Sequence, residues 1–556
     1  MSSKLENGTS QPSVNESIVQ TPNESQIDRV LNTHAPARRK FLKASGLTLA
    51  AAFLASCGGG PLATPAHSEG SPSPSPSPYT TPGEFGTPSP YISINVSPTP
   101  RPTSSLEATP TPAVTASPEA TPPADLMSSA ISEYAKTMGV KPETVNLSEH
   151  QYKDSSGASF SIMSTPDNTP LLIYDEYGGW RDANLQDLAT KSGLSLETMM
   201  QVTRQENGQW VDLTQNQDYT NLIKENANSL YTSGEADMSW VFGNFKTADW
   251  NNILSNWPTI QKELKAGTIP DGLPYNWVGL DRLVNFAQQN NMDVRGFHLI
   301  WGDDIPQSIL NYSNSDLKKI LEFTVRTRVL RHPEIKAWNI GDEIYARSLY
   351  QQGNTGGLWP DRFGAANIVA FVGNLVKESN PSAKLYVTED FVLEKNFPNP
   401  NFTQGFINYL KQIQAQGVKI DGVDIENNFW IYDPPDPKKI NSTLKAIEQL
   451  GIKTITSEET VSVSSTYPNW PSRPKTVTSV GNPLKSQAAI YKETLDAYLA
   501  NNTGSFGTGG VWDELAWQNS IGHPEAHAMI YDTNGNPKPA DYALRQSLLA
   551  YIQKTA

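Results

Sequence analysis

The chain has 556 residues, one cysteine and a formal net charge of -14, and its isoelectric point is near 5.1. This length exceeds what one compact core normally fills, so we expect a large domain with appendages. The acidic balance argues against a nucleic-acid partner, because no basic stripe is present to neutralise phosphates. A single cysteine excludes an intramolecular disulfide and a thiolate zinc cage.

Residues 1–56 are typical of an export signal. Arg38 and Arg39 precede a short stretch of small apolar residues, 44–55, as in signals of the twin-arginine type. The sequence LASC that ends this stretch resembles a bacterial lipobox, in which the cysteine, here Cys57, carries the lipid. Plain secretion and a membrane-spanning helix are the alternatives, but the stretch is too short to cross about 30 Å of hydrocarbon. The pattern predicts an exported protein, lipid-anchored through Cys57 at the outer face of a bacterial membrane or cell surface.

Residues 57–125 form a linker rich in proline, serine and threonine, with runs such as SPSPSPSPYTTP and ATPTPAVTASPEATPP. Such runs cannot pack a core and predict a disordered, extended tether, which at about 3 Å per residue would reach on the order of 200 Å. Its expected role is to hold a domain away from the cell envelope, although an inert low-complexity stretch would have the same composition. Residues 126–185 follow as a small lead-in segment, with a possible helix near 126–138 and the strand-like pieces SFSIMST and PLLIYDEY, and the sequence leaves its fold open.

Residues 186–556 alternate between strand-like and helical patterns. The predicted strands are DVRGFHLIW (293–301), IKAWNI (335–340), KLYVTE (384–389), IDGVDI (420–425), IKTITS (452–457) and GGVW (509–512). Between them, apolar residues recur at helical spacing in LDRLVNFAQQ, AANIVAFVGNLVKE, GFINYLKQIQ, STLKAIEQL and KSQAAIYKETLDAYLA. This alternation predicts an α/β fold with a parallel sheet, either a (β/α)8 TIM barrel or a doubly wound sheet. No glycine-rich phosphate-binding turn follows these strands, which weakens a nucleotide-binding role.

Two glutamates each close one of these apolar runs. Glu343 ends AWNIGDE (337–343), and Glu458 lies in TITSEETV (454–461). In a barrel the carboxyl ends of the strands converge on one face, so both side chains are expected in one site. Two carboxylates so placed are the minimum equipment for acid/base and nucleophilic chemistry on a glycosidic bond, whereas either alone would more often be solvated or salt-bridged.

From about residue 186 to the C-terminus the chain resembles glycoside hydrolase family 10, the xylanase family. Five segments carry the resemblance in the expected order, and any one of them alone is a weak signal. They are DGLPYNWVGLDRLVNFAQQNNMDVRGFHLIWGDDIP, AWNIGDE, IDGVDIENNF, SEETV and YDTNGNPKPADYAL. Their counterparts in the family are the third-strand region, the acid/base motif, the sixth-strand motif, the nucleophile motif and the C-terminal Asn-Pro-Lys-Pro-Ala-Tyr segment.

The resemblance implies a retaining hydrolase, with Glu343 as the general acid/base and Glu458 as the nucleophile. It also implies substrate-binding positions, several of which depart from the family. The family's asparagine before the acid/base is Asp342, and its sixth-strand glutamine and histidine are Glu426 and Asn428. The third strand keeps its tryptophan as Trp301, but Phe297 and Gly302 stand where the family has histidines. The second strand keeps Glu235 and loses the family's usual Asn and Lys. The shortened tail motif contains Trp512 and Trp517.

These departures make xylan a less secure expectation than glycosidase, because most side chains that read xylose hydroxyls are changed. The tryptophans are candidate sugar-stacking platforms, with packing in the barrel as the alternative. The sparse histidines form no metal-binding motif, so no metal and no other cofactor is expected, and His298 is more simply structural than catalytic. We expect a monomer acting on a polysaccharide or oligosaccharide. The alternatives are a carbohydrate-binding lipoprotein that has lost turnover and, less well supported, a solute-binding transport lipoprotein.

Overall fold

A computed structural model describes residues 121–555, apart from 155, 177, 207–208, 303, 351–356, 396, 398, 466–479, 502 and 521. The predicted signal and nearly all of the predicted linker lie outside the described residues, so the lipid anchor on Cys57 and the disordered tether remain predictions. Within the described part of the chain, no helix combines the length and the apolar character needed to cross a bilayer.

Eight parallel strands form the central sheet of the main domain. They are β5 (Ser195–Met200), β8 (Ser229–Thr232), β9 (Asp293–Gly296), β10 (Ala337–Asp342), β11 (Lys384–Glu389), β12 (Gly422–Ile425), β14 (Lys453–Ile455) and β16 (Ser505–Thr508). From β5 to β14 each of them lies beside the next in chain order, and β16 returns to pair with β5.

The sheet closes on itself between β14 and β16. Just beyond β14, Glu459 forms a parallel bridge with Thr508, and its backbone N–H donates to the carbonyl of Gly507 over 3.2 Å. A doubly wound sheet, which the sequence also allowed, would keep two open edges. The structure is therefore the predicted (β/α)8 TIM barrel.

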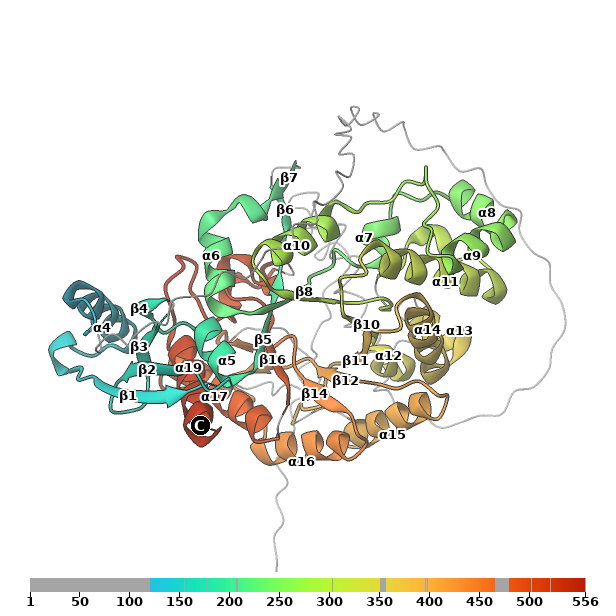
Figure 1. The fold of residues 1–556 in the computed structure, drawn as a ribbon. Helices are drawn as coiled ribbons and strands as arrows, with labels where there is room; N and C mark the ends of the chain where they lie inside the picture. Colours follow the sequence, from blue (N-terminus) through green and yellow to red (C-terminus); the bar gives the residue numbers. More distant parts are fainter. Residues whose placement is uncertain are drawn as a thin grey trace, which may run out of the picture. The chain divides into compact units, whose positions relative to one another are not determined.

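Helices cover the outside of the barrel (Figure 1). The main ones are α5 (Leu185–Ser192), α6 (Gln217–Asn226), α10 (Val278–Gln289), α11 (Asn314–Arg331), α14 (Ala365–Ser379), α15 (Phe402–Gln414), α16 (Pro437–Glu448), α17 (Pro483–Ala500) and α19 (Pro539–Thr555). Several of these helices begin with a capping residue whose side chain accepts a hydrogen bond from a backbone N–H group in the first turn. Asn184, Ser313 and Asn482 cap α5, α11 and α17 in this way.

Shorter elements follow the carboxyl ends of the strands, where the site is expected. They are α7 (Met238–Phe242), α8 (Thr247–Ser255), α9 (Trp257–Lys265), α12 (Ile344–Tyr350), α13 (Leu358–Phe363), α18 (Trp517–Ser520), the hairpin β6 (Thr203–Glu206) with β7 (Gln209–Asp212), and the pair β13 (Asn428–Trp430) with β15 (Thr460–Ser462).

Five of the six strands predicted from sequence are confirmed, and the sixth was placed wrongly. The run GGVW (509–512) forms no strand; the strand is the preceding SFGT, β16. Its apolar signal is weak because close packing demands small residues there: a Cβ on Gly507 would lie 2.4 Å from the carbonyl oxygen of Thr456. The small residues that the crowded barrel interior requires therefore gave this strand too weak an apolar pattern to be predicted.

The barrel interior contains a buried cation, Arg295 of β9. Its guanidinium donates to Glu197 over 2.8 and 2.9 Å, to Asp424 over 2.7 Å and to Asn339 over 2.7 Å. The Arg295 side chain is only 3% exposed, and it packs 5.1 Å from the ring centroid of Tyr231. Strands β5, β9, β10 and β12 are thus joined through one side chain beneath the site.

The lead-in segment folds as a small α+β module. Helix α4 (Ala124–Met138) starts two residues before the predicted boundary, and β1 (Ser148–Lys153), β2 (Ser159–Ser164), β3 (Pro170–Asp175) and β4 (Gly179–Asp182) form an antiparallel sheet in that order. Tyr134 of α4 meets Tyr542 of α19 edge to face with ring centroids 5.2 Å apart. Leu171 and Leu172 belong to the same apolar cluster, so the module packs on the C-terminal helix.

Candidate active site

Glu343 stands at the carboxyl end of β10, where the chain turns into α12. Its φ is +50°, which is unusual for a residue with a side chain and marks a constrained position. Its backbone N–H donates to Thr388 on β11 over 3.2 Å, and its carbonyl accepts from the N–H of Arg347 over 2.9 Å. Both neighbours thus fix the direction in which the Glu343 side chain leaves the strand.

Two donors hold the Glu343 carboxylate by one oxygen. The indole N–H of Trp301 donates to Oε2 over 2.8 Å, and Nε of Arg347 donates to the same atom over 3.0 Å. The Arg347 guanidinium also lies 5.6 Å from the ring centroid of Trp301. Oε1 receives neither of these hydrogen bonds.

Glu458 follows β14 and is half-buried, whereas its neighbour Glu459 is fully buried. Asn428 hydrogen-bonds the Glu458 side chain. The Asn428 amide oxygen is occupied by the hydroxyl of Thr460 over 2.7 Å, so its NH2 group is the side that faces Glu458. Burial, and next the charge of Asp424, raise the pKa of Glu458 to about 7, while the hydrogen bond from Asn428 opposes that rise.

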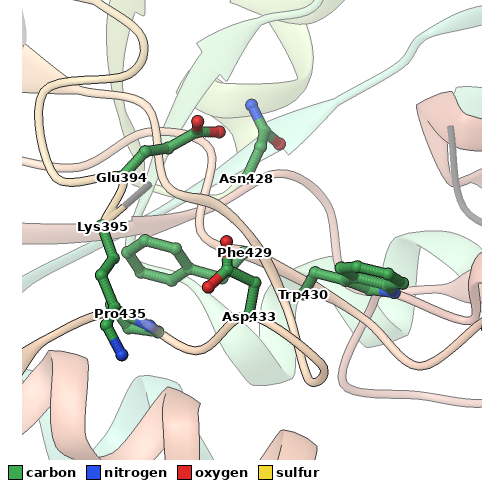
Figure 2. A pocket seen from close by; sticks show the side chains of 7 residues that line it. All are labelled: Glu394, Lys395, Asn428, Phe429, Trp430, Asp433 and Pro435. Atoms are coloured by element: carbon green, nitrogen blue, oxygen red, sulfur yellow. The ribbon is translucent and has the colours of Figure 1, made fainter. Parts of the chain in front are cut away.

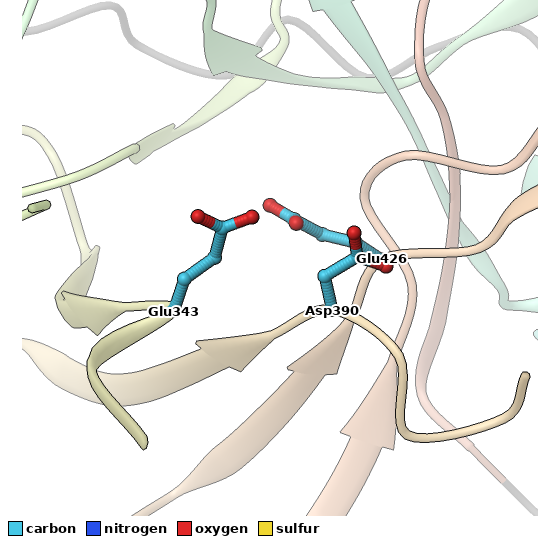
Figure 3. Close-up of side chains that lie close together, drawn as sticks. All are labelled: Glu343, Asp390 and Glu426. Carbon is cyan, nitrogen blue, oxygen red and sulfur yellow. The ribbon is translucent and has the colours of Figure 1, made fainter. Parts of the chain in front are cut away.

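Asp390 and Glu426 complete a group of three carboxylates with Glu343. Oxygens of the three lie within 4.8 Å of one another, and Figure 3 shows Glu343 and Glu426 extending toward each other from different strand ends. Burial raises the pKa of Glu426 well above its usual value, and the charges of Asp342 and Glu458 add to the rise. Burial likewise raises the pKa of Asp390, with Glu394 as the next contributor.

Sequence reasoning missed Asp390 and Arg347. Asp390 directly follows the predicted strand 384–389, so the argument that selected the two glutamates at strand ends would have found it. Arg347 is four residues after Glu343, a spacing that brings side chains together only if a helix starts at the glutamate. That helix was not predicted.

Among the described residues, Glu343, Asp390 and Glu426 form the one group whose oxygens are close enough to share a metal ion. The guanidinium of Arg347 already binds Glu343 and would oppose a cation there. The expectation of no catalytic metal stays a prediction.

His298 lies between two acids at the side of the site. Its Nδ1 is 3.2 Å from Asp237 and its Nε2 is 3.2 Å from Asp342. Burial, and next the charge of Arg328, lower the pKa of His298 to about 3, so the imidazole is neutral. Burial and the charge of Glu343 raise the pKa of Asp342 well above its usual value. Asp342, which stands where the resembled family has an asparagine, therefore adds a carboxyl group whose protonated form is favoured.

The other predicted substrate-binding residues are spread over the same face. Glu235 is buried, and its carboxylate accepts from the backbone N–H groups of Val202 and Ser233 over 3.1 and 2.9 Å. Trp512 stacks on Tyr219 with centroids 6.2 Å apart. Trp517 packs against the cluster that contains Trp430. Their binding roles stay predictions.

A small, open hollow borders Asn428, the partner of Glu458. Figure 2 shows the amide of Asn428 and the carboxylate of Glu394 on the same side of this hollow. Its lining is Glu394, Lys395, Asn428, Phe429, Trp430, Asp433 and Pro435. Charged groups and aromatic rings thus border the same hollow beside Glu458.

Comparison with known proteins places this arrangement in a family. The sequence model described as Glycosyl hydrolase family 10 matches residues 184–547. Endo-1,4-beta-xylanase B of Thermotoga neapolitana is 27% identical over 302 residues, which cover 53% of this chain and 80% of that protein. Endo-1,4-beta-xylanase 3 of Hypocrea jecorina is 26% identical over 268 residues, covering 48% and 67%.

Solved structures agree on the fold. Xylanase 10B from Thermotoga petrophila, crystallised with xylobiose, superposes with a TM-score of 0.54 at 20% identity, covering 67% of this chain and all of that one. Native xylanase 10B from Thermotoga maritima gives a TM-score of 0.52 at 18% identity with the same coverage. With a family match over more than half of its length, the chain belongs to glycosyl hydrolase family 10 and is a glycosidase.

Proposed function

We propose that this glycosidase cleaves a β-1,4-linked, xylan-type polysaccharide with retention of configuration. Glu343 is assigned as the general acid/base and Glu458 as the nucleophile. The observation that supports this proposal is that two glutamates, from the ends of β10 and β14, lie on one face of the barrel. Trp301 and Arg347 hold Glu343, and Asn428 holds Glu458. The relatives named as endo-1,4-beta-xylanases support xylan as the substrate.

The proposed reaction has two displacements. In the first, a carboxylate oxygen of Glu458 bonds to the anomeric carbon while the glycosidic C–O bond breaks, and a proton from Glu343 goes to the leaving oxygen. In the second, Glu343 takes a proton from water, whose oxygen displaces Glu458 from the anomeric carbon. The first half releases the leaving-group sugar with a new hydroxyl at the former glycosidic oxygen, the second releases the other sugar with a new reducing end, and both glutamates return to their starting states.

Retention is tested by the first product formed. Proton NMR during early turnover of a β-1,4-xylo-oligosaccharide by the full-length protein is expected to show the β-anomer before mutarotation produces the α-anomer. Early appearance of the α-anomer would replace double displacement with a single displacement by water, and would remove the nucleophilic role from Glu458.

The pH dependence of turnover should reflect the raised pKa of Glu458. Its folded-state pKa is about 7, so the ionised nucleophile becomes populated only as the pH rises through that value. We expect the acid limb of the kcat/KM profile near pH 7. Asp424→Asn should move this limb to lower pH, because the charge of Asp424 is, after burial, the largest contribution to the raised pKa of Glu458.

The matched control for this experiment is Glu493→Gln. Glu493 is an exposed residue of α17, so its substitution removes the same charge from the protein surface. Its kcat/KM profile should overlay that of the wild type. An acid limb that stays in place or moves upward in Asp424→Asn would show that the charge of Asp424 does not act on the titration of the nucleophile.

One contact favours a second function, a carbohydrate-binding barrel without turnover. Arg347 forms an ion pair with Glu343, the group that must deliver a proton. If this contact blocks catalysis, the wild type will bind xylo-oligosaccharides in calorimetry without releasing reducing sugar, and Arg347→Met will gain activity. Loss of activity in Arg347→Met would instead show that the arginine positions Glu343 for catalysis.

We propose further that the enzyme is held at the cell surface by a lipid on Cys57, as the sequence LASC at residues 54–57 indicates. Cys57→Ser should abolish incorporation of labelled palmitate and release the protein from the membrane fraction, whereas Ser68→Ala in the linker should change neither. Palmitate labelling that persists in Cys57→Ser would reject this anchor.

A further inference from the structure

A tryptophan on the β6–β7 hairpin is presented to solvent. Among the described residues, Trp210 is the large hydrophobic side chain with the highest exposed fraction, 57%. It lies on β7 opposite Gln205 of β6. In Figure 1 this hairpin extends beyond the end of β5, close to α10. A large exposed aromatic ring on the active-site side of a barrel is a candidate contact surface for a ligand.

Contacts within the protein fix the direction of this ring. The indole of Trp210 meets Trp240 of α7 edge to face, with ring centroids 5.0 Å apart and an interplanar angle of 81°. Trp240 is itself partly buried against the main core. Trp210 therefore loses little conformational entropy when a ligand covers it, whereas a freely rotating surface side chain would lose more.

The hairpin is also tied to the barrel on both sides. Asp212 of β7 forms an ion pair with Arg282 of α10 at 3.1 Å, and Arg204 of β6 forms one with Glu514 at 3.4 Å. Glu514 lies two residues after Trp512, so the second ion pair joins the hairpin to the segment that carries the predicted tail-motif tryptophans. The hairpin is thus part of the rim of the site.

Two contacts link the start of α7, the helix that carries Trp240, to the catalytic centre. Asp237, which precedes α7, lies 3.2 Å from His298, and His298 lies 3.2 Å from Asp342, the neighbour of Glu343. The pair of tryptophans therefore borders the same face of the barrel as the catalytic carboxylates but belongs to the ends of β5 and β8. A polymer that crosses the site can reach this edge with a sugar unit that is not being cleaved.

We propose that Trp210 is a stacking platform for a pyranose unit of the substrate chain at a distance from the cleaved bond. This inference rests on the proposed function for the identity of the ligand, a neutral β-linked glycan. The rings of such a glycan have C–H faces that match the flat, electron-rich face of an indole. Trp240 supports the ring from one side and leaves the remaining surface of Trp210 to the sugar.

The test compares a long and a short substrate on the full-length protein. Trp210→Ala should lower kcat/KM for xylohexaose about three- to tenfold, mainly through KM, because one stacking contact is lost. The effect of Trp210→Ala on an aryl β-xylobioside should be much smaller, because this substrate is too short to reach from the cleaved bond to Trp210. Trp210→Phe should recover part of the loss. The matched control is Trp180→Ala on β4 of the lead-in module, where Trp180 packs on Tyr174 at 5.4 Å.

A second readout separates this inference from the proposed hydrolysis. In native gels that contain xylan, binding to xylan slows the migration of a protein. Trp210→Ala should be slowed less than the wild type and less than Trp180→Ala, whether or not the protein hydrolyses xylan. If neither substrate is cleaved but the difference in retardation remains, the proposed function fails and the platform stands. If Trp210→Ala and Trp180→Ala behave alike on both substrates and in the gels, the platform is rejected.

Discussion

Replacing Glu458 with alanine is expected to lower kcat/KM on a β-1,4-xylo-oligosaccharide about 10⁴-fold or more, as losses of a covalent nucleophile do. The variant has no group that can form the glycosyl-enzyme, although Glu343 can still protonate the leaving oxygen. Azide should restore turnover of an activated aryl glycoside by entering the space left by the carboxylate. The rescued product should be the α-glycosyl azide, because azide then attacks directly and inverts the anomeric centre.

The neighbouring glutamate supplies the matched control. Glu459 is fully buried, and its side chain lies near Asn427 and Thr494 rather than facing the open site. Glu459→Gln keeps the shape of the side chain and should leave kcat/KM within about threefold of the wild type. If Glu459→Gln abolished turnover while Glu458→Ala retained it, the nucleophile would be assigned to the wrong one of two adjacent glutamates.

Replacing Arg295 with methionine is expected to lower the free energy of unfolding by about 3–5 kcal/mol, because it leaves buried carboxylates without their cation. Glu197 and Asp424 both bind this guanidinium, and the Asp424 side chain is fully buried. Urea denaturation followed by tryptophan fluorescence would measure the change as a shift of the midpoint. The arginine acts on the nucleophile as well, since its charge opposes the rise in the pKa of Glu458.

Two variants make this result interpretable. Arg331→Met removes an arginine whose side chain is 42% exposed and which pairs with Asp281, so it should cost less than about 1 kcal/mol. Adding Glu197→Gln and Asp424→Asn to Arg295→Met should recover much of the lost stability, because no buried charge is then left unpaired. Equal midpoints for Arg295→Met and Arg331→Met would show that the internal cation contributes little.

The repeating part of the fold could be predicted from the sequence because its strands are apolar and regularly spaced. KLYVTE and IDGVDI have this pattern, and they form β11 and β12. β16 could not be recognised, since the close approach of Thr456 requires a glycine at residue 507 and Phe506 is the only large apolar residue of the strand. Closure of the sheet was likewise undecided, because it depends on one bridge between Glu459 and Thr508.

The candidate site was only partly accessible to sequence reasoning. Glu343 and Glu458 were selected because each ends an apolar run, which is a local signal. The contact of Trp301 with Glu343 and that of His298 with Asp342 join different strands, so they appear only when the barrel brings these strands together. The raised pKa values of Glu426 and Asp342 depend on the same convergence, because burial and neighbouring charges act through space.

The packing of the lead-in module on α19 bears on how the protein can be divided. A fragment cut at the family boundary, residue 184, would lack α4 and the antiparallel sheet. It would uncover Tyr542, which is 2% exposed in the intact chain, and remove the partner of Gln546, whose amide donates to Thr169 over 2.7 Å. Recombinant versions that keep Ala124 onward should therefore remain soluble where shorter ones aggregate, because the smallest autonomous folding unit is larger than the region of family resemblance.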